Sequence, residues 1–171
     1  MNRGKLWFVF ILAVLFLLQQ GSQSFAGDST YSRATLRGLR GVYVKVDRLA
    51  SEVVREGLTE QHIEEEVKQK LDSAGIRILS DTEGPRQFGN PYLHIKPRIT
   101  KTKTGLYLCF ITVEFVQDAR LVRNRSLLRP VETWSVGVEG TIYKNLSEKV
   151  GNHIKDLMDR FIDAYLSVNP R

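Results

Sequence analysis

Cysteine is almost absent from this 171-residue chain, in which Cys109 is the only one, so no disulfide can form within it. A domain of this size must then be stabilised by a packed apolar core. Cys109 stands in an apolar stretch with no evident activating partner. We therefore interpret it as a small core residue, with a reactive thiol as the alternative.

Sequence motifs for nucleophile activation or phosphate binding are missing as well. The chain has no Gly-x-Ser-x-Gly turn, no Ser-x-x-Lys box and no Gly-x-x-x-x-Gly-Lys loop. Its three histidines, His62, His94 and His153, lack the spacing of a zinc site. The sequence therefore predicts no catalytic residue, metal ligand or cofactor. It leaves enzyme activity open but favours a binding function.

Long apolar runs are confined to the N-terminus. Thirteen apolar residues, 6–18, follow Arg3 and Lys5, and small residues precede a cleavage point between Ala26 and Gly27. A membrane-spanning helix needs about 20 apolar residues, so this pattern predicts a removable export signal over residues 1–26. The alternative is an uncleaved N-terminal anchor. We expect a periplasmic or secreted protein with no stable membrane span after cleavage and no nucleic-acid partner.

Charge of one sign is only slightly in excess. The chain carries 25 basic and 19 acidic residues, a net charge of +6. Arg3 and Lys5 are the only charged residues of the expected signal, so the remainder has a net charge of +4. A mild positive charge is compatible with an anionic lipid or polymer as ligand but does not require one.

Alternating and helical patterns divide the remainder of the chain. Residues 27–40 are polar without a clear period, which predicts a flexible lead-in. Strand patterns occupy residues 41–47, 76–79, 92–99, 106–117 and 131–143. Helix patterns follow the caps Thr59 and Asn145, the first ending at Gly75 and the second near Val168.

These elements predict a single α+β domain over residues 41–171. The expected architecture is a two-layer sandwich, with a largely antiparallel sheet of four to five strands and two amphipathic helices on one face. Pro97 cannot donate a ladder hydrogen bond, so the strand that contains it should lie at an edge or carry a bulge.

The order of elements resembles that of small bacterial envelope proteins. The chain is similar to the lipopolysaccharide-assembly lipoprotein and to modules of other periplasmic assembly proteins. The similarity lies in the order of the strand 42–46, the helix capped by Thr59 and ending in Ala74-Gly75-Ile76, the long strands and the closing helix. The segments 133–137 and 163–170 also resemble exported bacterial proteins. The lipid-bearing cysteine of that lipoprotein has no counterpart after the apolar run. No functional residue carries over from either group.

Four apolar residues are candidates for a partner-binding surface. If both helices cover one sheet face, then apolar side chains of the other face need a different cover. We expect an envelope protein or a lipid to contact Tyr43, Leu106, Leu108 and Phe110.

Four basic residues are candidates for anion binding. Lys96 and Arg98 lie on one strand pattern, and Arg123 and Arg125 follow a later one. If the two segments share a sheet edge, they form a positive patch for a polyanionic ligand. The alternative is a solvated edge whose charges prevent strand pairing.

The sequence therefore predicts an exported, non-enzymatic binding or assembly module of the bacterial envelope. The alternative is an envelope hydrolase or transferase that uses the strand carboxylates Glu114 and Glu139. The same two residues also fit cross-strand ion pairs, which are common between neighbouring strands.

Overall fold

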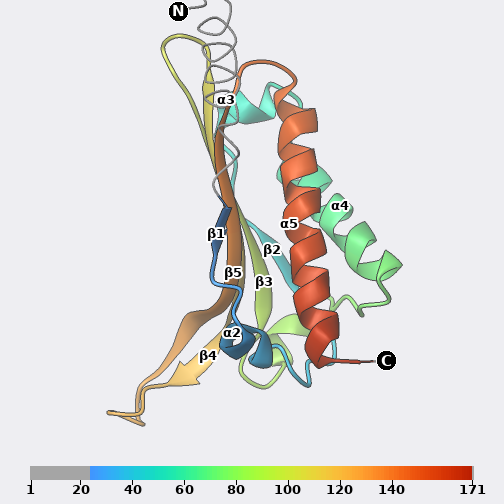
Figure 1. The fold of residues 1–171 in the computed structure, drawn as a ribbon, viewed down its shortest axis with the longest axis vertical. Coiled ribbons are helices and arrows are strands. Elements are labelled where there is room, and N and C mark those ends of the chain that lie inside the picture. Colours follow the sequence, from blue (N-terminus) through green and yellow to red (C-terminus); the bar gives the residue numbers. More distant parts are fainter. Residues whose placement is uncertain (1–23, 171) are drawn as a thin grey trace, which may run out of the picture.

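A five-stranded sheet forms one layer of the molecule (Figure 1). The computed structural model describes residues 24–170. The strands lie in the order β1-β5-β4-β3-β2, and all neighbours are antiparallel except β2 and β3. Their bounds are β1 Ser24–Ala26, β2 Val44–Val46, β3 Tyr92–Lys101, β4 Tyr107–Arg120 and β5 Leu128–Ile142. The predicted α+β class and the largely antiparallel sheet are confirmed.

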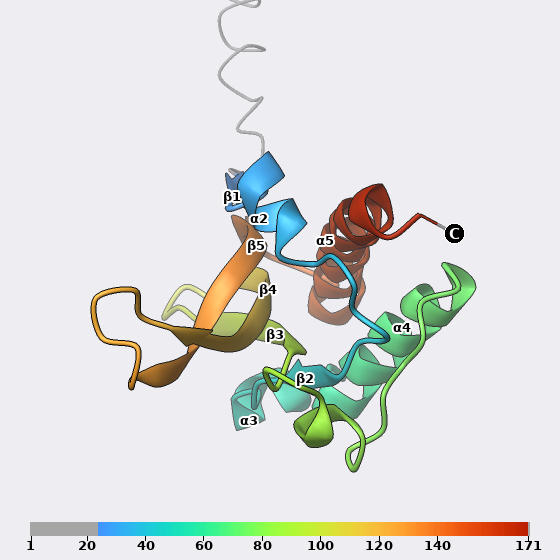
Figure 2. The same ribbon diagram turned by 90° about the horizontal axis from the view of Figure 1, so that it is seen from below.

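Two long helices form the second layer. α4 (Glu60–Ser73) packs beside β2, and α5 (Leu146–Val168) packs on β4 and β5, so both cover the same face of the sheet (Figures 1 and 2). The shorter helices are α2 (Thr30–Ala34), α3 (Ser51–Val54) and the 3-10 turn η1 (Gly84–Arg86). The two-layer sandwich expected from the sequence is therefore present, and none of the helices within residues 24–170 covers the opposite face of the sheet.

Aromatic residues form the centre of the core between the layers. The Phe161 ring of α5 lies 5.3 Å from the Trp134 ring in edge-to-face geometry and 6.1 Å from the Phe115 ring. All three side chains are at most 1% exposed. Burying residues of this size provides much of the folding free energy, at about 25 cal/mol per Å² of apolar surface.

Local sequence signals position the two helices. Thr59 Oγ1 accepts a hydrogen bond from the backbone N–H of His62 at 3.2 Å, as its cap role predicts. Gly75 ends α4 with a φ of 67°, a conformation that favours glycine. Asn145 differs from the prediction: its φ is 57°, and its amide donates to the Glu148 carboxylate rather than capping the backbone.

The segment 27–40 differs from the flexible lead-in that its composition predicts. It contains α2 and the fully buried Leu36, and it packs against α5 and β5. Asp28 accepts a hydrogen bond from the indole Nε1 of Trp134 at 2.9 Å and pairs with Arg33 at 2.6 Å. The contact with Trp134 joins residues more than one hundred positions apart, so the local pattern did not reveal it.

Most of the predicted export signal lies outside the described residues. Only its last three residues are described, and these form β1, which pairs with β5 from Ser24 opposite Val138 to Ala26 opposite Val136. The next residue, Gly27, donates a backbone hydrogen bond to the Ser135 carbonyl at 2.9 Å. Within residues 24–170, no helix has the length and apolar character of a membrane span.

Candidate functional site

The predicted apolar surface is only partly assembled by the fold. Leu108 and Phe110 lie on the helix-free face of β4 and are 52% and 39% exposed. Leu106 lies before β4 in the hairpin turn, where it exchanges hydrogen bonds with Thr102. Leu108 pairs with Thr100 on β3, whereas the end of this face before β2 is level with Tyr92, eight residues or about 26 Å further along β3.

Tyr43 belongs to that distant end and is separate from the other three residues. It precedes β2, and its carbonyl accepts a hydrogen bond from Leu93 on β3 at 2.8 Å. Gly84 packs so closely on its ring that a Cβ there would lie 2.4 Å from the ring. Burial raises the pKa of Tyr43, and the nearby Asp81 carboxylate adds to the effect. The η1 segment therefore supplies the cover that the sequence left open for Tyr43.

The predicted positive patch is not assembled either. Lys96 donates to both carboxylate oxygens of Glu114, at 3.0 and 2.9 Å. Arg98 pairs in register with Phe110 on the helix-free face, whereas Arg123 and Arg125 lie in the hairpin loop beyond Arg120. The loop begins about 33 Å further along β4. β3 is also not an edge over its whole length, because β2 covers residues 93–95; Pro97 lies beyond that short partner.

Glu114 and Glu139 do not form a close carboxylate pair. Glu139 pairs with Phe110, four residues along β4 from Glu114, a backbone separation of about 13 Å. Glu114 is 8% exposed and accepts hydrogen bonds from Lys96 and from the Thr112 hydroxyl. Glu114 thus forms the cross-strand ion pair that its position on a strand also allowed.

Thiol and metal chemistry receive little support from the described residues. Cys109 is buried under the helices, and desolvation raises the pKa of its thiol to about 11, so the unreactive protonated form prevails. Within residues 24–170, no group of three or more His, Cys, Asp or Glu side chains is placed to hold a metal ion.

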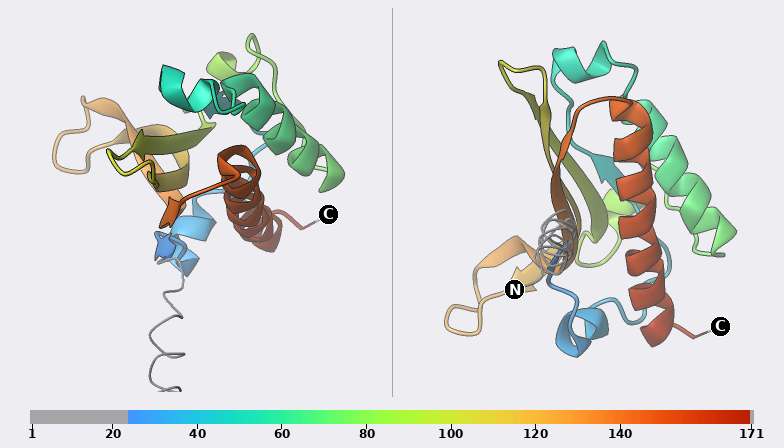
Figure 3. Two further views of the ribbon diagram at one scale, coloured as in Figure 1. Left: turned by 90° about the horizontal axis from the view of Figure 1, so that it is seen from above. Right: turned by 45° about the horizontal axis from the view of Figure 1, so that its top comes forward.

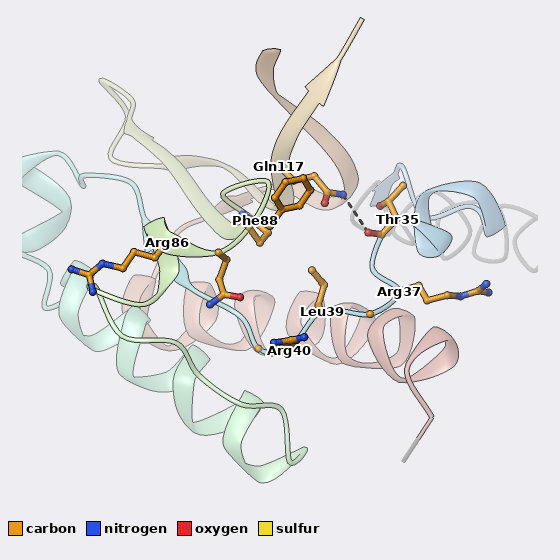
Figure 4. Close-up of a pocket in the computed structure, with 11 residues that line it drawn as sticks. Thr35, Arg37, Leu39, Arg40, Arg86, Phe88 and Gln117 are labelled. Carbon is orange, nitrogen blue, oxygen red and sulfur yellow. Dashed lines mark hydrogen bonds between the residues drawn. The ribbon is translucent and has the colours of Figure 1, made fainter. Parts of the chain in front are cut away.

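A cavity of about 600 Å³ lies at one end of the molecule. Its walls are the connector 35–41 after α2, the loop 86–91 after η1, and Gln117 of β4 (Figure 4). Small-molecule sites commonly have volumes of about 300–1,000 Å³. Three segments far apart in the sequence therefore meet around a space large enough for a ligand.

The end of α5 holds the connector wall of this cavity in place. Asn169 accepts a hydrogen bond from Gly38 N–H at 2.7 Å and donates to the Leu36 carbonyl at 2.8 Å. The Tyr165 hydroxyl donates to the Leu39 carbonyl at 2.9 Å. These side chains bind backbone groups, so the connector is preorganised without a secondary-structure ladder.

Strand β4 holds both walls of the cavity. Gln117 donates to the Thr35 carbonyl at 3.2 Å and to the Thr133 hydroxyl at 2.9 Å. The backbone N–H of Asp118 donates to the Gly89 carbonyl at 2.7 Å. The loop 86–91 is consequently tied to the sheet on the side that faces the connector.

Positive charge dominates the rim of the cavity. Arg37, Arg40 and Arg86 line it, and no acidic residue does. None of the three guanidinium groups forms a hydrogen bond or ion pair with another residue in the described part of the chain. Unpaired arginines on one rim raise the local concentration of anions and offer bidentate donors to carboxylate or phosphate.

A second cavity differs from the first in that its charged side chains are paired. It has about 450 Å³ and lies between α4 and α5. Its charged residues pair with one another: Lys155 with Glu66 at 2.9 Å, and Lys70 with Asp159. Because these charges are compensated internally, this second cavity offers no comparable attraction for an ionic ligand.

Figure 4 shows how the side chains of the rim are arranged. Arg37 and Arg86 lie on opposite sides, with guanidinium groups directed outward, while Leu39, Phe88 and Gln117 lie between them. The Phe88 side chain is fully exposed. The cavity thus has two apolar side chains, Leu39 and Phe88, between cations at its margin, and exposed arginines reorient in nanoseconds to meet a ligand.

Sequence reasoning missed this cavity. The composition of residues 27–40 predicts only a lead-in, and residues 86–91 lie between the predicted strands 76–79 and 92–99, so the patterns do not single out Arg37, Arg40 or Arg86. The signal present in the sequence was the Gly89-Asn90-Pro91 turn, in which both Gly89 and Asn90 adopt positive φ values. Only the tertiary contacts of α5 and β4 place that turn opposite the connector.

Comparisons with known proteins identify no family. No protein-family model matches the chain, and none of the curated proteins matches its sequence. A dodecameric PelC variant from Paraburkholderia phytofirmans aligns with 80% of this chain and 92% of its own, at 16% identity and a TM-score of 0.41. A minor lipoprotein from Acinetobacter baumannii aligns with 72% of this chain and 90% of its own, at 13% identity and a TM-score of 0.34.

Proposed function

We propose that this protein is an exported, non-enzymatic binding module of the bacterial envelope whose ligand carries several carboxylate or phosphate groups. Export is supported by the apolar run 6–18 and the small residues before Gly27. The envelope is suggested by the order of elements. The chemistry of the proposed ligand is inferred from the arginine-rimmed cavity.

The uncompensated charge of the rim is the observation on which this proposal rests. Arg37, Arg40 and Arg86 surround a cavity of about 600 Å³ that no carboxylate lines. A ligand with spaced anionic groups would engage more than one guanidinium group at once, while Phe88 and Leu39 would contact its apolar face. Such multipoint contact gains affinity because the walls are already held by α5 and β4.

Calorimetric titration with oligogalacturonate and with linear polyphosphate tests the proposal. The variant R37Q/R40Q/R86Q should lose at least about tenfold in association constant, and the loss should shrink as salt is added. The control R48Q/R55Q/K103Q removes the same charge from exposed positions outside the cavity and should bind almost normally. Equal binding by both variants, or effective competition by neutral dextran, would refute the assignment.

The helix-free sheet face is proposed as a second contact, made with an envelope protein. Its support is the exposure of the neighbouring side chains Leu108 and Phe110, with Arg98 opposite Phe110 in register. Exposed apolar side chains that share a sheet face often mark interaction sites. This contact uses other residues than the cavity, so substitutions can separate the two.

A further inference from the structure

The hairpin between β4 and β5 projects away from the two-layer body (Figures 1 and 3). Its turn is ordered by its own backbone, because Asn124 N–H donates to the Leu121 carbonyl at 3.2 Å and Leu127 N–H donates to Asn124 at 3.1 Å. The Asn124 side chain also accepts from the Ser126 hydroxyl at 2.6 Å. The tip is therefore a defined structure that can reach a flat surface before the body does.

Apolar and cationic side chains share this tip. Val122 is 89% exposed, and Leu121 and Leu128 are each 43% exposed. No acidic residue occurs in the segment 119–131, which contains four arginines: Arg120, Arg123, Arg125 and Arg129. Arg120 and Arg129 each donate one hydrogen bond to a carbonyl within the hairpin, at 2.9 and 3.0 Å, which supports the turn and keeps their charges at the tip.

We propose that this tip docks on the surface of a phospholipid bilayer that contains anionic headgroups. Val122, Leu121 and Leu128 would enter the boundary between headgroups and acyl chains. The arginines would bind lipid phosphates and keep their apolar stems along the inserted residues. The charge of residues 119–131 is therefore opposite in sign to that of an anionic surface.

The size of the tip favours a bilayer over a folded protein partner. A stable protein interface buries about 800 Å² on each partner, and a narrow hairpin with three exposed apolar residues offers less. A membrane surface needs only a few apolar side chains beside clustered cations, since each basic residue near anionic lipid strengthens binding by about fivefold. The arginine-rimmed cavity uses other residues, so the two proposals succeed or fail separately.

A dye placed at the tip reports its environment directly. In the full-length Val122→Cys variant an environment-sensitive dye attaches selectively, because Cys109 is buried and its thiol is protonated. Vesicles with three parts phosphatidylcholine to one part phosphatidylglycerol should raise the dye fluorescence about threefold or more, and pure phosphatidylcholine should not. The control Thr104→Cys places the dye in the β3–β4 turn, which is also basic but has no fully exposed apolar residue.

The proposal is overturned if the dye at position 122 stays unchanged, if the dye at position 104 responds equally, or if soluble polyphosphate gives the same rise. Cosedimentation supplies an independent measurement. Val122→Asp should lower partitioning onto the anionic vesicles about tenfold relative to Val122→Ser. All variants share the same N-terminus, so its contribution is constant, and equal partitioning of the Asp and Ser variants would contradict insertion of the tip.

Discussion

Lys96 Nζ lies 2.9 Å from Glu114 Oε2 and 3.0 Å from Oε1, and this ion pair joins β3 to β4 on the helix-free face of the sheet. Thr112 adds a hydrogen bond to the same carboxylate at 3.0 Å. The pair engages a lysine that the sequence assigned to anion binding and a glutamate that it offered as a catalytic alternative. The geometry therefore supports a structural role for both residues.

Removing only the cation of this pair should destabilise the fold. Lys96→Met leaves the carboxylate of Glu114, 8% exposed, without its main partner, and we expect a loss of about 2–3 kcal/mol in the free energy of unfolding. The double variant Lys96→Met/Glu114→Leu should recover most of that loss, because no charge remains unpaired. Urea denaturation at pH 7 measures both. A single variant as stable as the parent would show that the pair contributes little.

The fold was predictable where local patterns and burial agree. Thr59, Gly75 and the stripe Ile63, Val67 and Leu71 define α4 from sequence alone, and the structure buries that stripe. Local patterns did not predict that β2 pairs in parallel with β3, or that segment 27–40 adopts a defined structure. Both features depend on distant partners such as the contact between Asp28 and Trp134.

Only part of the candidate sites could be anticipated, for a related reason. Alternation along β4 correctly placed Leu108 and Phe110 on the exposed face. It gave no position along the sheet, so Tyr43 was grouped with residues that lie far from it. The arginine cavity was missed because the C-terminal end of α5, at Tyr165 and Asn169, holds the connector that carries Arg37 and Arg40.

Asp28 should link stability to pH. The hydrogen bonds from Arg33, the larger effect, and from Trp134 lower the pKa of Asp28 below its ordinary value of 3.8. A lowered folded-state pKa adds stability above the unfolded-state pKa, and this stability is lost as the pH falls through the folded value. Asp28→Ala should cost about 1–3 kcal/mol at pH 7, because the indole N–H also loses its partner.

Denaturation of the Asp28→Ala variant and its parent at several pH values tests this linkage. The difference in unfolding free energy should be constant from pH 7 to pH 5 and should shrink below pH 3.8, where the unfolded chain takes up a proton that the folded protein binds only at lower pH. Asp28→Asn keeps an acceptor for Trp134 and should be destabilised less than the alanine variant. A difference that grows as the solution is acidified would contradict the assigned direction.

Cys109 should react with thiol reagents only when the fold opens. Desolvation under the helices raises the pKa of its thiol to about 11, so at pH 8 the thiolate fraction is about one in a thousand. With a disulfide reagent we expect slow labelling of the native protein and rapid, complete labelling in urea. Fast native labelling at a rate that does not depend on denaturant would show an accessible thiol instead of a core residue.

Leu108 provides the sharpest test of whether the helix-free face is a surface or a covered core. Its side chain is 52% exposed, whereas Ile111, three residues along the same strand, is fully buried under the helices. Leu108→Asp should therefore change the free energy of unfolding by no more than about 0.5 kcal/mol, as is typical of surface positions. Ile111→Asp should abolish folding, because it buries an unpaired carboxylate.

If an envelope protein binds this face, Leu108→Asp should release it from the folded protein while oligogalacturonate binding at the cavity persists. Unfolding of the Leu108→Asp variant would instead mean that the position belongs to the core.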